Sequence, residues 1–377
     1  MQIAFQATLK PPDHPVPSGD RLMARLLMSA LDRIGDVRVA SRFVSRSRSP
    51  DPAHLTAIRS AALAEADKLI KAYTDGSWRP DVWLTYHLYY KAPDWIGATV
   101  SAALGIPYVV AEASYAGKRD RDAWAPWQAD AVTQMRAADL IFCFSQLDRV
   151  GLAKVVAPDR LRDLAPFLDT KAFDRSAERS LRREGPVQLV TVAMMRHDAK
   201  LESYRHIAGA LQQLSPHHWH WHVVGDGAAE ADVRAASASL DPARITWHGR
   251  LESVDVRRVL READVFVWPG VREGFGMAYL EAQALGLPVV AFRTGGVPAV
   301  VRHGETGLLV DDQTADAFAG ALYRLIADPD LRARMGRAAR HFVLRERSLV
   351  HASNVIAEGL AAAASHHQLR LCRRPGA

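Results

Sequence analysis

Cysteine and long apolar runs are both scarce in this sequence. The chain has 2 cysteines, Cys143 and Cys372, which lie far apart and lack the spacing of a metal site. We therefore expect reduced thiols in a cytoplasmic protein rather than a disulfide framework. The longest weakly polar run, residues 96–111, is interrupted by Gly105 and Pro107 and is too short for a transmembrane helix. The amino terminus also lacks the basic start and apolar core of a signal peptide.

Charge of one sign is not in large excess either. Lys and Arg number 48 against 42 Asp and Glu, a net charge of +6 that both halves of the chain share evenly. This distribution excludes a basic nucleic-acid-binding arm. The mild excess suits a polyphosphate ligand, a weak peripheral contact of loop 42–48 and helix 54–73 with the inner face of a membrane, or a plain solvated surface. No histidine or carboxylate cluster has metal-ligand spacing, so we expect no metal.

The alternation of strand and helix patterns predicts two α/β domains. The composition, 49% hydrophobic and 24% charged, is typical of a globular protein. A chain of 377 residues is too long for a single hydrophobic core of ordinary size. Apolar runs and amphipathic helical patterns alternate from residue 2 to about residue 167, and a second alternation begins at residue 187. The polar segment 169–186 between them is predicted to be an interdomain linker.

One stretch, residues 272–292, organises the second half of the chain. Glu273 leads into a tight Gly-Phe-Gly turn at 274–276, and a helix is predicted over 277–285 before a buried strand. Gly286 is placed to end that helix in the left-handed conformation. The glycines allow the backbone to approach a ligand closely, and the free N–H groups at the start of the helix favour an anion.

This stretch resembles the donor-binding motif of the retaining GT-B glycosyltransferases, specifically family four, the glycosyl transferases group 1. The matching positions are Glu273, Gly274, Phe275, Gly276, Glu281, residues 286–291 and residues 295–296. The resemblance is strong over residues 187–345 and diffuse over residues 1–168. The alternative for this stretch is a plain helix–strand unit with two solvated glutamates, because short motifs also match by chance.

The resemblance implies a fold and a domain division. The expected class is α/β, with two doubly wound Rossmann-like domains facing across a cleft, which is the GT-B arrangement. Residues 1–168 would form the acceptor-side domain and residues 169–345 the nucleotide-sugar domain. Residues 346–377 would hold a final helix that packs back on the first domain, followed by a basic tail. That tail, from residue 366, has too little apolar pattern to predict a helix.

The resemblance also assigns roles in the second domain, with Glu273, Arg196 and Lys200 as the catalytic residues. Glu273 would hold sugar hydroxyls, and Arg196 and Lys200 would hold the diphosphate, whose charge grows as the glycosidic bond breaks. A solvated pair of basic residues is the alternative for the last two. Other donor contacts would come from Glu281 to the ribose, from Arg250 and Leu251 to the base, and from the turn and helix start at Gly274, Phe275, Gly276 and Met277.

In the first domain the resemblance is less complete. Gly19 would approach the donor phosphates, although a helix cap by Ser18 or Asp20 explains the same residues. His87 follows the predicted strand 82–86, at the end where α/β sheets bind ligands. The family's second histidine, which lies near the sugar, is replaced here by Glu112. Either Glu112 substitutes for it or His87 reaches the sugar, and an ordinary loop histidine is an equal alternative.

The implied reaction is transfer of a sugar from a nucleotide-sugar donor to an acceptor hydroxyl, with retention at the anomeric carbon. No cofactor is expected, since the donor is a substrate. Two alternatives stay open: a nucleotide-sugar epimerase or phosphorylase on the same fold, and a non-catalytic nucleotide-sugar-binding protein. A NAD-dependent dehydrogenase is a more distant one, resting on a partial glycine fingerprint at Gly225 and Gly227. Trp124 and Trp127 could stack on an acceptor sugar, but we favour ordinary packing for both.

Overall fold

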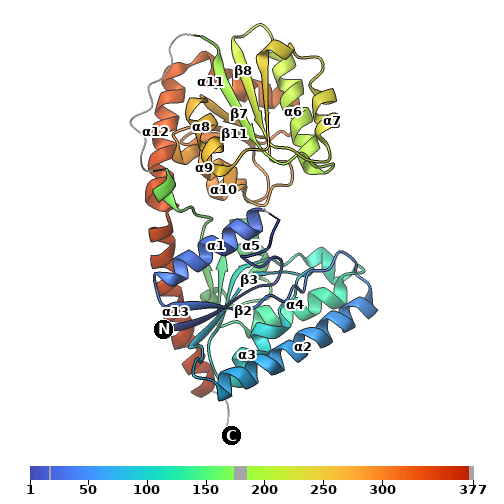
Figure 1. Cartoon of the computed structure of the whole chain (residues 1–377), viewed down its shortest axis with the longest axis vertical. Coiled ribbons are helices and arrows are strands. Elements are labelled where there is room, and N and C mark those ends of the chain that lie inside the picture. Colours follow the sequence, from blue (N-terminus) through green and yellow to red (C-terminus); the bar gives the residue numbers. More distant parts are fainter. Residues whose placement is uncertain (17, 174–184, 373–377) are drawn as a thin grey trace. The chain divides into compact units, whose positions relative to one another are not determined.

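The computed structural model describes residues 1–16, 18–173 and 185–372 (Figure 1). The chain folds into two compact units. Unit 1 consists of Met1–Ala165 and Leu349–Ala377, and unit 2 of Pro166–Ser348. The linker predicted over 169–186 falls largely on residues 174–184, outside the described residues.

Unit 1 is built on a sheet of six parallel strands in the order β2-β1-β3-β4-β5-β6. The strands are β1 (Gln2–Ala7), β2 (Asp36–Ser41), β3 (Val82–Leu88), β4 (Tyr108–Ala113), β5 (Leu140–Cys143) and β6 (Leu161–Asp163). The helices are α1 (Gly19–Asp32), α2 (Pro52–Asp75), α3 (Trp95–Leu104), α4 (Ala125–Ala137), α5 (Gln146–Leu152), the 3-10 turns η1 (Gly117–Asp120) and η2 (Pro158–Arg160), and α13 (Leu349–Cys372). The chain leaves β1 for β2 on one side and returns to β3 on the other, so the direction of the strand order reverses between β1 and β3.

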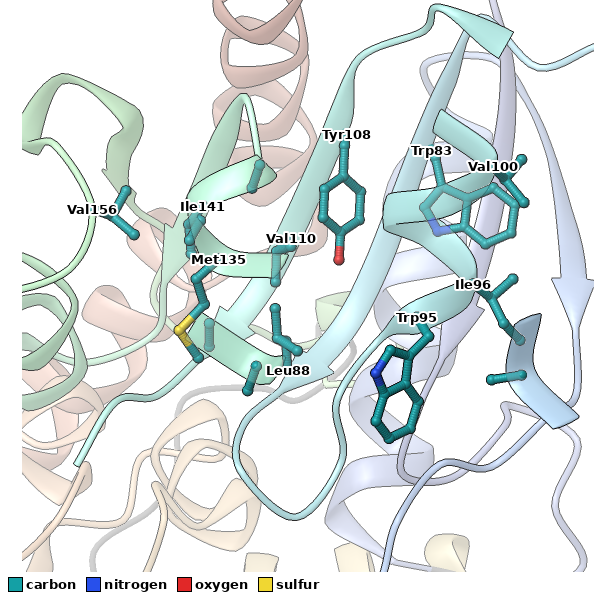
Figure 2. Packing of buried hydrophobic residues seen from close by; sticks show 14 of the residues in the cluster. Trp83, Leu88, Trp95, Ile96, Val100, Tyr108, Val110, Met135, Ile141 and Val156 are labelled. Carbon is teal, nitrogen blue, oxygen red and sulfur yellow. The ribbon is translucent and has the colours of Figure 1, made fainter. Parts of the chain in front are cut away.

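The core of unit 1 is aromatic, and the buried carboxylate of Asp94 lies within it. Figure 2 shows Trp83, Trp95 and Tyr108 among the apolar side chains packed beside the strands. Asp94 caps α3 and accepts hydrogen bonds from the Tyr108 hydroxyl at 2.8 Å and the Gly97 N–H at 2.8 Å. Trp124 and Trp127 belong to the same core cluster, which confirms packing as the role of these two residues.

Unit 2 contains a second sheet of six parallel strands, in the order β12-β11-β10-β7-β8-β9. The strands are β7 (Val187–Val192), β8 (Trp219–Val224), β9 (Ile245–Gly249), β10 (Val265–Val267), β11 (Val289–Phe292) and β12 (Gly307–Val310). The helices are α6 (Ala199–Gln213), α7 (Glu230–Ala236), α8 (Ser253–Glu262), α9 (Met277–Ala284), α10 (Val297–Val300), α11 (Ala315–Ala327) and α12 (Pro329–Glu346), with η3 (Thr170–Ala172) and η4 (Pro242–Arg244). Here the strand order reverses between β7 and β10, and both sheets are doubly wound as expected.

The last helix, α13, is longer than the sequence pattern indicates. The helix runs to Cys372 and includes residues 366–372, for which the sequence pattern was too weak to predict a structure. Tertiary contacts explain the extension: His367 Nδ1 lies 3.0 Å from a carboxylate oxygen of Asp139, whose side chain is fully buried beside β5. Arg370 contacts the other carboxylate oxygen at 3.3 Å. Asp139 lies in unit 1, 228 positions before His367, so the spacing of apolar residues within the helix does not reveal this contact.

Two further differences place candidate residues inside regular elements. Strand β3 continues through His87, and β4 includes Glu112, so neither residue lies in a loop. Both have positive φ, 68° and 61°, a conformation that non-glycine residues seldom adopt. Helix α6 starts at Ala199, because Asp198 caps it and accepts from the Lys200 N–H. Lys200 therefore stands in the first turn of α6.

Candidate functional site

The predicted residues of unit 2 gather where the strand order reverses. Arg196 follows β7, and the turn that begins at Glu273 follows β10, the neighbouring strand. The carboxyl ends of parallel strands meet at one edge of a sheet, and a reversal point opens a crevice there. Direct bonds join the two segments: the Val271 N–H donates to Ser203 Oγ of α6 at 3.0 Å.

Lys200 and Glu273 form an ion pair at this edge. The Lys200 ammonium lies 2.5 Å from Glu273 Oε2, and each side chain is 17% exposed. The Trp268 indole N–H donates to the same oxygen at 3.2 Å. A shielded pair of this kind is held more firmly than a surface pair, yet it stays open enough for a ligand to reach. The structure therefore brings together two of the three residues predicted to be catalytic.

Arg196 lies apart from this pair and is solvent-accessible. Its nearest ionic partner is Asp198, at 3.5 Å, and both side chains are about half exposed. Such a pair contributes little binding energy of its own, so the guanidinium is available to an incoming anion. A phosphate group is a natural partner, since guanidinium forms strong charge-assisted hydrogen bonds to phosphate oxygens.

Close backbone contacts shape the turn at 274–276. Gly276 has φ 74°, and a Cβ there would lie 2.6 Å from the ring of Tyr279. A Cβ on Gly296 would lie 1.9 Å from the Gly274 carbonyl oxygen, so the 295–296 segment can approach the turn only as glycine. Helix α9 begins directly after Gly276 and has no side-chain cap, which leaves its first N–H groups without a side-chain partner.

Gly225 and Gly227 have a packing explanation of the same kind. A Cβ on Gly225 would lie 1.9 Å from the Ala193 carbonyl oxygen, and one on Gly227 would lie 2.1 Å from that of Met195. Both glycines therefore allow the loop after β8 to pack against the loop after β7, and the Met195 N–H donates to the Asp226 backbone carbonyl oxygen at 2.7 Å. The partial fingerprint has a structural cause that needs no dinucleotide.

The other predicted donor residues lie at the same sheet edge but are not bonded to the ion pair. Glu281 is half-buried on α9, where burial raises the pKa of its carboxyl to about 7 against the opposing effect of Arg257. Arg250 is exposed and Leu251 half-buried, directly after β9. Among the described residues, no hydrogen bond or ion pair joins these three to Glu273.

A second cluster of charged groups stands at the reversal point of unit 1. His87 Nδ1 lies 3.6 Å from Asp20 Oδ1 and 3.7 Å from Glu112 Oε1. Asp20 comes from the first turn of α1, which follows β1, so three elements contribute. Gly19 is exposed beside it, and Ser18 caps α1 by accepting from the Arg21 N–H. The two residues that the sequence left as alternatives for a sugar contact, His87 and Glu112, are thus neighbours.

The cluster shifts the protonation of its members. Burial alone would lower the pKa of His87, but the carboxylates of Glu112 and Asp20 outweigh it and raise that pKa to about 9. Burial raises the pKa of Glu112 to about 7, although the charge of His87 opposes the change. Near neutral pH the cluster therefore holds an imidazolium beside two carboxyls, of which Asp20 is ionised because its pKa is lowered by His87 against the effect of burial.

The sequence-based analysis did not identify Trp268 or Tyr279 as site residues. Trp268 directly follows β10, and its place at the carboxyl end of a strand was the available signal. Tyr279 lies under the turn, and its hydroxyl donates to the Trp268 carbonyl oxygen at 3.0 Å. No periodicity distinguishes such a supporting tyrosine from an ordinary core residue.

Among the described residues there is neither a cluster of metal ligands nor a helix that could cross a membrane. Across residues 1–16, 18–173 and 185–372, no group of three or more His, Cys, Asp or Glu side chains is arranged to hold a metal ion. No helix in the same ranges combines the length and apolar character that a bilayer crossing requires.

Residues 173–342 match the family model described as Glycosyl transferases group 1. A D-inositol 3-phosphate glycosyltransferase from Corynebacterium glutamicum (strain R) is 32% identical over 199 residues, 48% of this chain and 47% of that protein. A GDP-mannose-dependent monoacylated alpha-(1-6)-phosphatidylinositol monomannoside mannosyltransferase from Corynebacterium glutamicum (strain ATCC 13032) is 38% identical over 131 residues, 33% of this chain and 34% of that protein. The chain thus spans about half the length, or less, of these curated relatives.

Among solved structures, the fold is similar to that of HepE from Anabaena in complex with UDP. The TM-score is 0.72 at 17% sequence identity, over 96% of this chain and 100% of that chain. At this level of identity the similarity shows the fold, and it extends over both units. The expected fold class, two doubly wound Rossmann-like domains as in GT-B proteins, is confirmed.

Proposed function

Residues 173–342 match the glycosyl transferases group 1 family, and on that premise we propose that the chain transfers a sugar from a nucleotide-sugar donor to an acceptor hydroxyl. The observation that carries the proposal is the shielded Lys200–Glu273 pair at the reversal point of unit 2, beside the exposed Arg196. A cationic group for phosphate and a carboxylate for hydroxyls stand at one ligand-binding edge. The relatives support this, since one is named as GDP-mannose-dependent and the HepE structure contains UDP.

The proposed division of labour follows the charges. Arg196 and Lys200 neutralise the diphosphate, whose negative charge grows as the glycosidic bond breaks, and the uncapped start of α9 adds N–H donors. Glu273 accepts hydrogen bonds from sugar hydroxyls. Glu281 binds the ribose, and Arg250 and Leu251 line the base. With these groups the phosphates are neutralised without a metal ion, and we propose a metal-independent reaction.

We further propose that the transfer retains the anomeric configuration, as the motif at Glu273 and Glu281 implies. The cluster in unit 1, with His87 and Glu112, is proposed to contact the sugar in place of the family's histidine. Its carboxylate and imidazolium groups can each bond a hydroxyl. For the acceptor, the names of the relatives point to inositol phosphates and to mannosylated phosphatidylinositol as the first compounds to test.

The proposal is tested by incubating the protein with UDP-, GDP- and ADP-sugars and these acceptors, with EDTA present throughout. We expect release of the nucleoside diphosphate that depends on acceptor, and an α-linked product from an α-linked donor, as measured by NMR. A product of inverted configuration would contradict retention, and loss of activity in EDTA would contradict metal independence. Binding of nucleotide sugars without any turnover would favour the non-catalytic alternative, and rearrangement of the donor without acceptor would favour an epimerase.

A further inference from the structure

The side chain of Trp268 touches both charged groups of the pair in unit 2. Its indole N–H donates to Glu273 Oε2 at 3.2 Å, and the Lys200 ammonium lies 5.2 Å from the centroid of its ring. One residue therefore bonds the carboxylate with its edge and attracts the cation with its face. The side chain is only 3% exposed, so it supports the pair from within the fold.

The surroundings of Trp268 leave its ring little freedom. The Tyr204 ring packs edge-on against it, with 5.1 Å between centroids. The Tyr279 hydroxyl donates to its backbone carbonyl oxygen at 3.0 Å. Tyr204 belongs to α6, which also carries Lys200, and Tyr279 belongs to α9, which follows the Gly-Phe-Gly turn. Residues of both α6 and α9 therefore contact Trp268.

We propose that Trp268 is a positioning residue that orients the Glu273 carboxylate toward the transferred sugar. This inference rests on the proposed function. Lys200 and the indole N–H both bond Oε2, and among the described residues no hydrogen bond reaches Oε1, which is left to accept from a sugar hydroxyl. When a diphosphate binds, it competes with Glu273 for Lys200. The indole N–H is then the donor that keeps the carboxylate in place.

The indole N–H of Trp268 should therefore matter for binding of the sugar and not for binding of the bare nucleotide. Trp268→Phe keeps an aromatic face for Lys200 and removes the N–H together with part of the ring volume, a loss of volume that the control below shares. Calorimetry is run with the pairs UDP-glucose and UDP, and GDP-mannose and GDP. We expect the better-bound nucleotide sugar to lose affinity by about tenfold, as for a lost hydrogen bond to a charged group, while the matching diphosphate changes by less than about twofold.

Trp221 offers a matched control in the same sheet. Its indole N–H also donates to a side chain, Thr191 Oγ1, at 3.0 Å, and it is fully buried in β8. Trp221→Phe therefore removes the same chemical group at a place that does not touch Glu273. We expect this variant to leave the ratio of nucleotide-sugar affinity to diphosphate affinity unchanged. Circular dichroism melting curves show which variants fold, and Trp268→Tyr, which also lacks the indole N–H, replaces Trp268→Phe if that variant does not.

A double-mutant comparison separates positioning from general packing. If Trp268 acts through Glu273, then Trp268→Phe added to Glu273→Ala should cause little further loss of nucleotide-sugar affinity. The inference would be overturned if Trp268→Phe weakened binding of the nucleotide sugar and of the diphosphate equally. It would also be overturned if Trp268→Phe lowered nucleotide-sugar affinity by the same factor with and without Glu273. A wild type that binds nucleotide sugars but transfers none would refute the proposed activity while this comparison still decides the role of Trp268. A wild type that binds none of the four probes would refute both.

Discussion

At the scale of single residues, Lys200 and Glu273 are ionic partners of each other. Their charged groups lie 2.5 Å apart. A bound diphosphate would take Lys200 as its own partner and release the Glu273 carboxylate for sugar hydroxyls. The pair therefore ties binding of the phosphate to exposure of the sugar-binding group. Arg196, with only an exposed partner, remains free of this competition.

This competition predicts that three substitutions differ in their effect on nucleoside diphosphate binding. Arg196→Ala removes a phosphate contact and should weaken binding about ten- to a hundred-fold, as should Lys200→Ala, because a charge-assisted contact contributes about 1.5–3 kcal/mol. Glu273→Gln frees Lys200 and should leave that affinity unchanged or raise it, while turnover falls in all three variants. Calorimetry with UDP and GDP, run beside turnover, measures both quantities.

The control is Glu202→Gln. Glu202 lies on α6, the helix that also carries Lys200, and it forms an exposed ion pair with Arg272 at 2.9 Å. The substitution should change neither quantity, since exposed pairs contribute little. Diphosphate binding weakened as much by Glu273→Gln as by Arg196→Ala would show that Glu273 does not act on the sugar.

At the scale of elements, α13 shows how a buried charge can extend a helix past the end of its apolar pattern. Asp139 is fully buried in front of β5 and accepts from the Tyr108 N–H at 3.0 Å. His366, His367 and Arg370 from the last turns of α13 all contact its carboxylate. One carboxylate thus links β4, the start of β5 and the carboxyl-terminal end of α13.

Asp139→Ala should therefore release the end of α13. We expect the free energy of unfolding to fall by about 3 kcal/mol, because the substitution leaves several buried donors without an acceptor. Urea unfolding measures the loss, and hydrogen exchange should show faster exchange at residues 366–372. Glu358→Gln, which removes an exposed ion pair of the same helix with Arg162, serves as control and should change neither. Unchanged exchange in the Asp139 variant would show that another contact holds these turns.

At the scale of the whole molecule, the titrating cluster in unit 1 makes stability depend on pH. A carboxyl whose pKa is higher in the folded protein than in the unfolded chain binds its proton more tightly when folded. The raised pKa of Glu112, about 7 instead of 4.5, therefore stabilises the folded state in acid, and this contribution is lost as pH rises through 7. The raised pKa of His87, about 9 instead of 6.5, adds a contribution that is present below 6.5 and lost as pH rises through 9.

The free energy of unfolding should accordingly fall between about pH 5 and pH 9. The loss assigned to Glu112 is on the order of 3 kcal/mol, since each unit of pKa difference between 4.5 and about 7 corresponds to about 1.4 kcal/mol. In Glu112→Gln the decline between pH 5 and 7 should be absent. Urea unfolding at a series of pH values, with Glu358→Gln as the control carboxylate, measures the slopes. A Glu112→Gln variant with the wild-type slope would exclude Glu112 as its source.

The sequence by itself determined the class of the fold and which segment carries the candidate site in unit 2. Strand and helix periods are local properties, so the two doubly wound sheets could be predicted from apolar spacing with modest errors at element ends. The segment around Glu273 and the Gly-Phe-Gly turn was equally visible, because its residues are contiguous. Gly286 does adopt the left-handed conformation expected at the end of α9, with φ 78°.

Only the tertiary structure decided which side chains meet. Lys200 and Glu273 are 73 positions apart, and their contact depends on β7 and β10 being neighbours in the sheet. His87 and Glu112 meet because β3 and β4 pair in register, and both take positive φ under surroundings that no local pattern encodes. Trp268 looked like any apolar residue at a strand end. Its bond to Glu273 exists because the turn folds back over β10, and packing between distant segments sets that geometry.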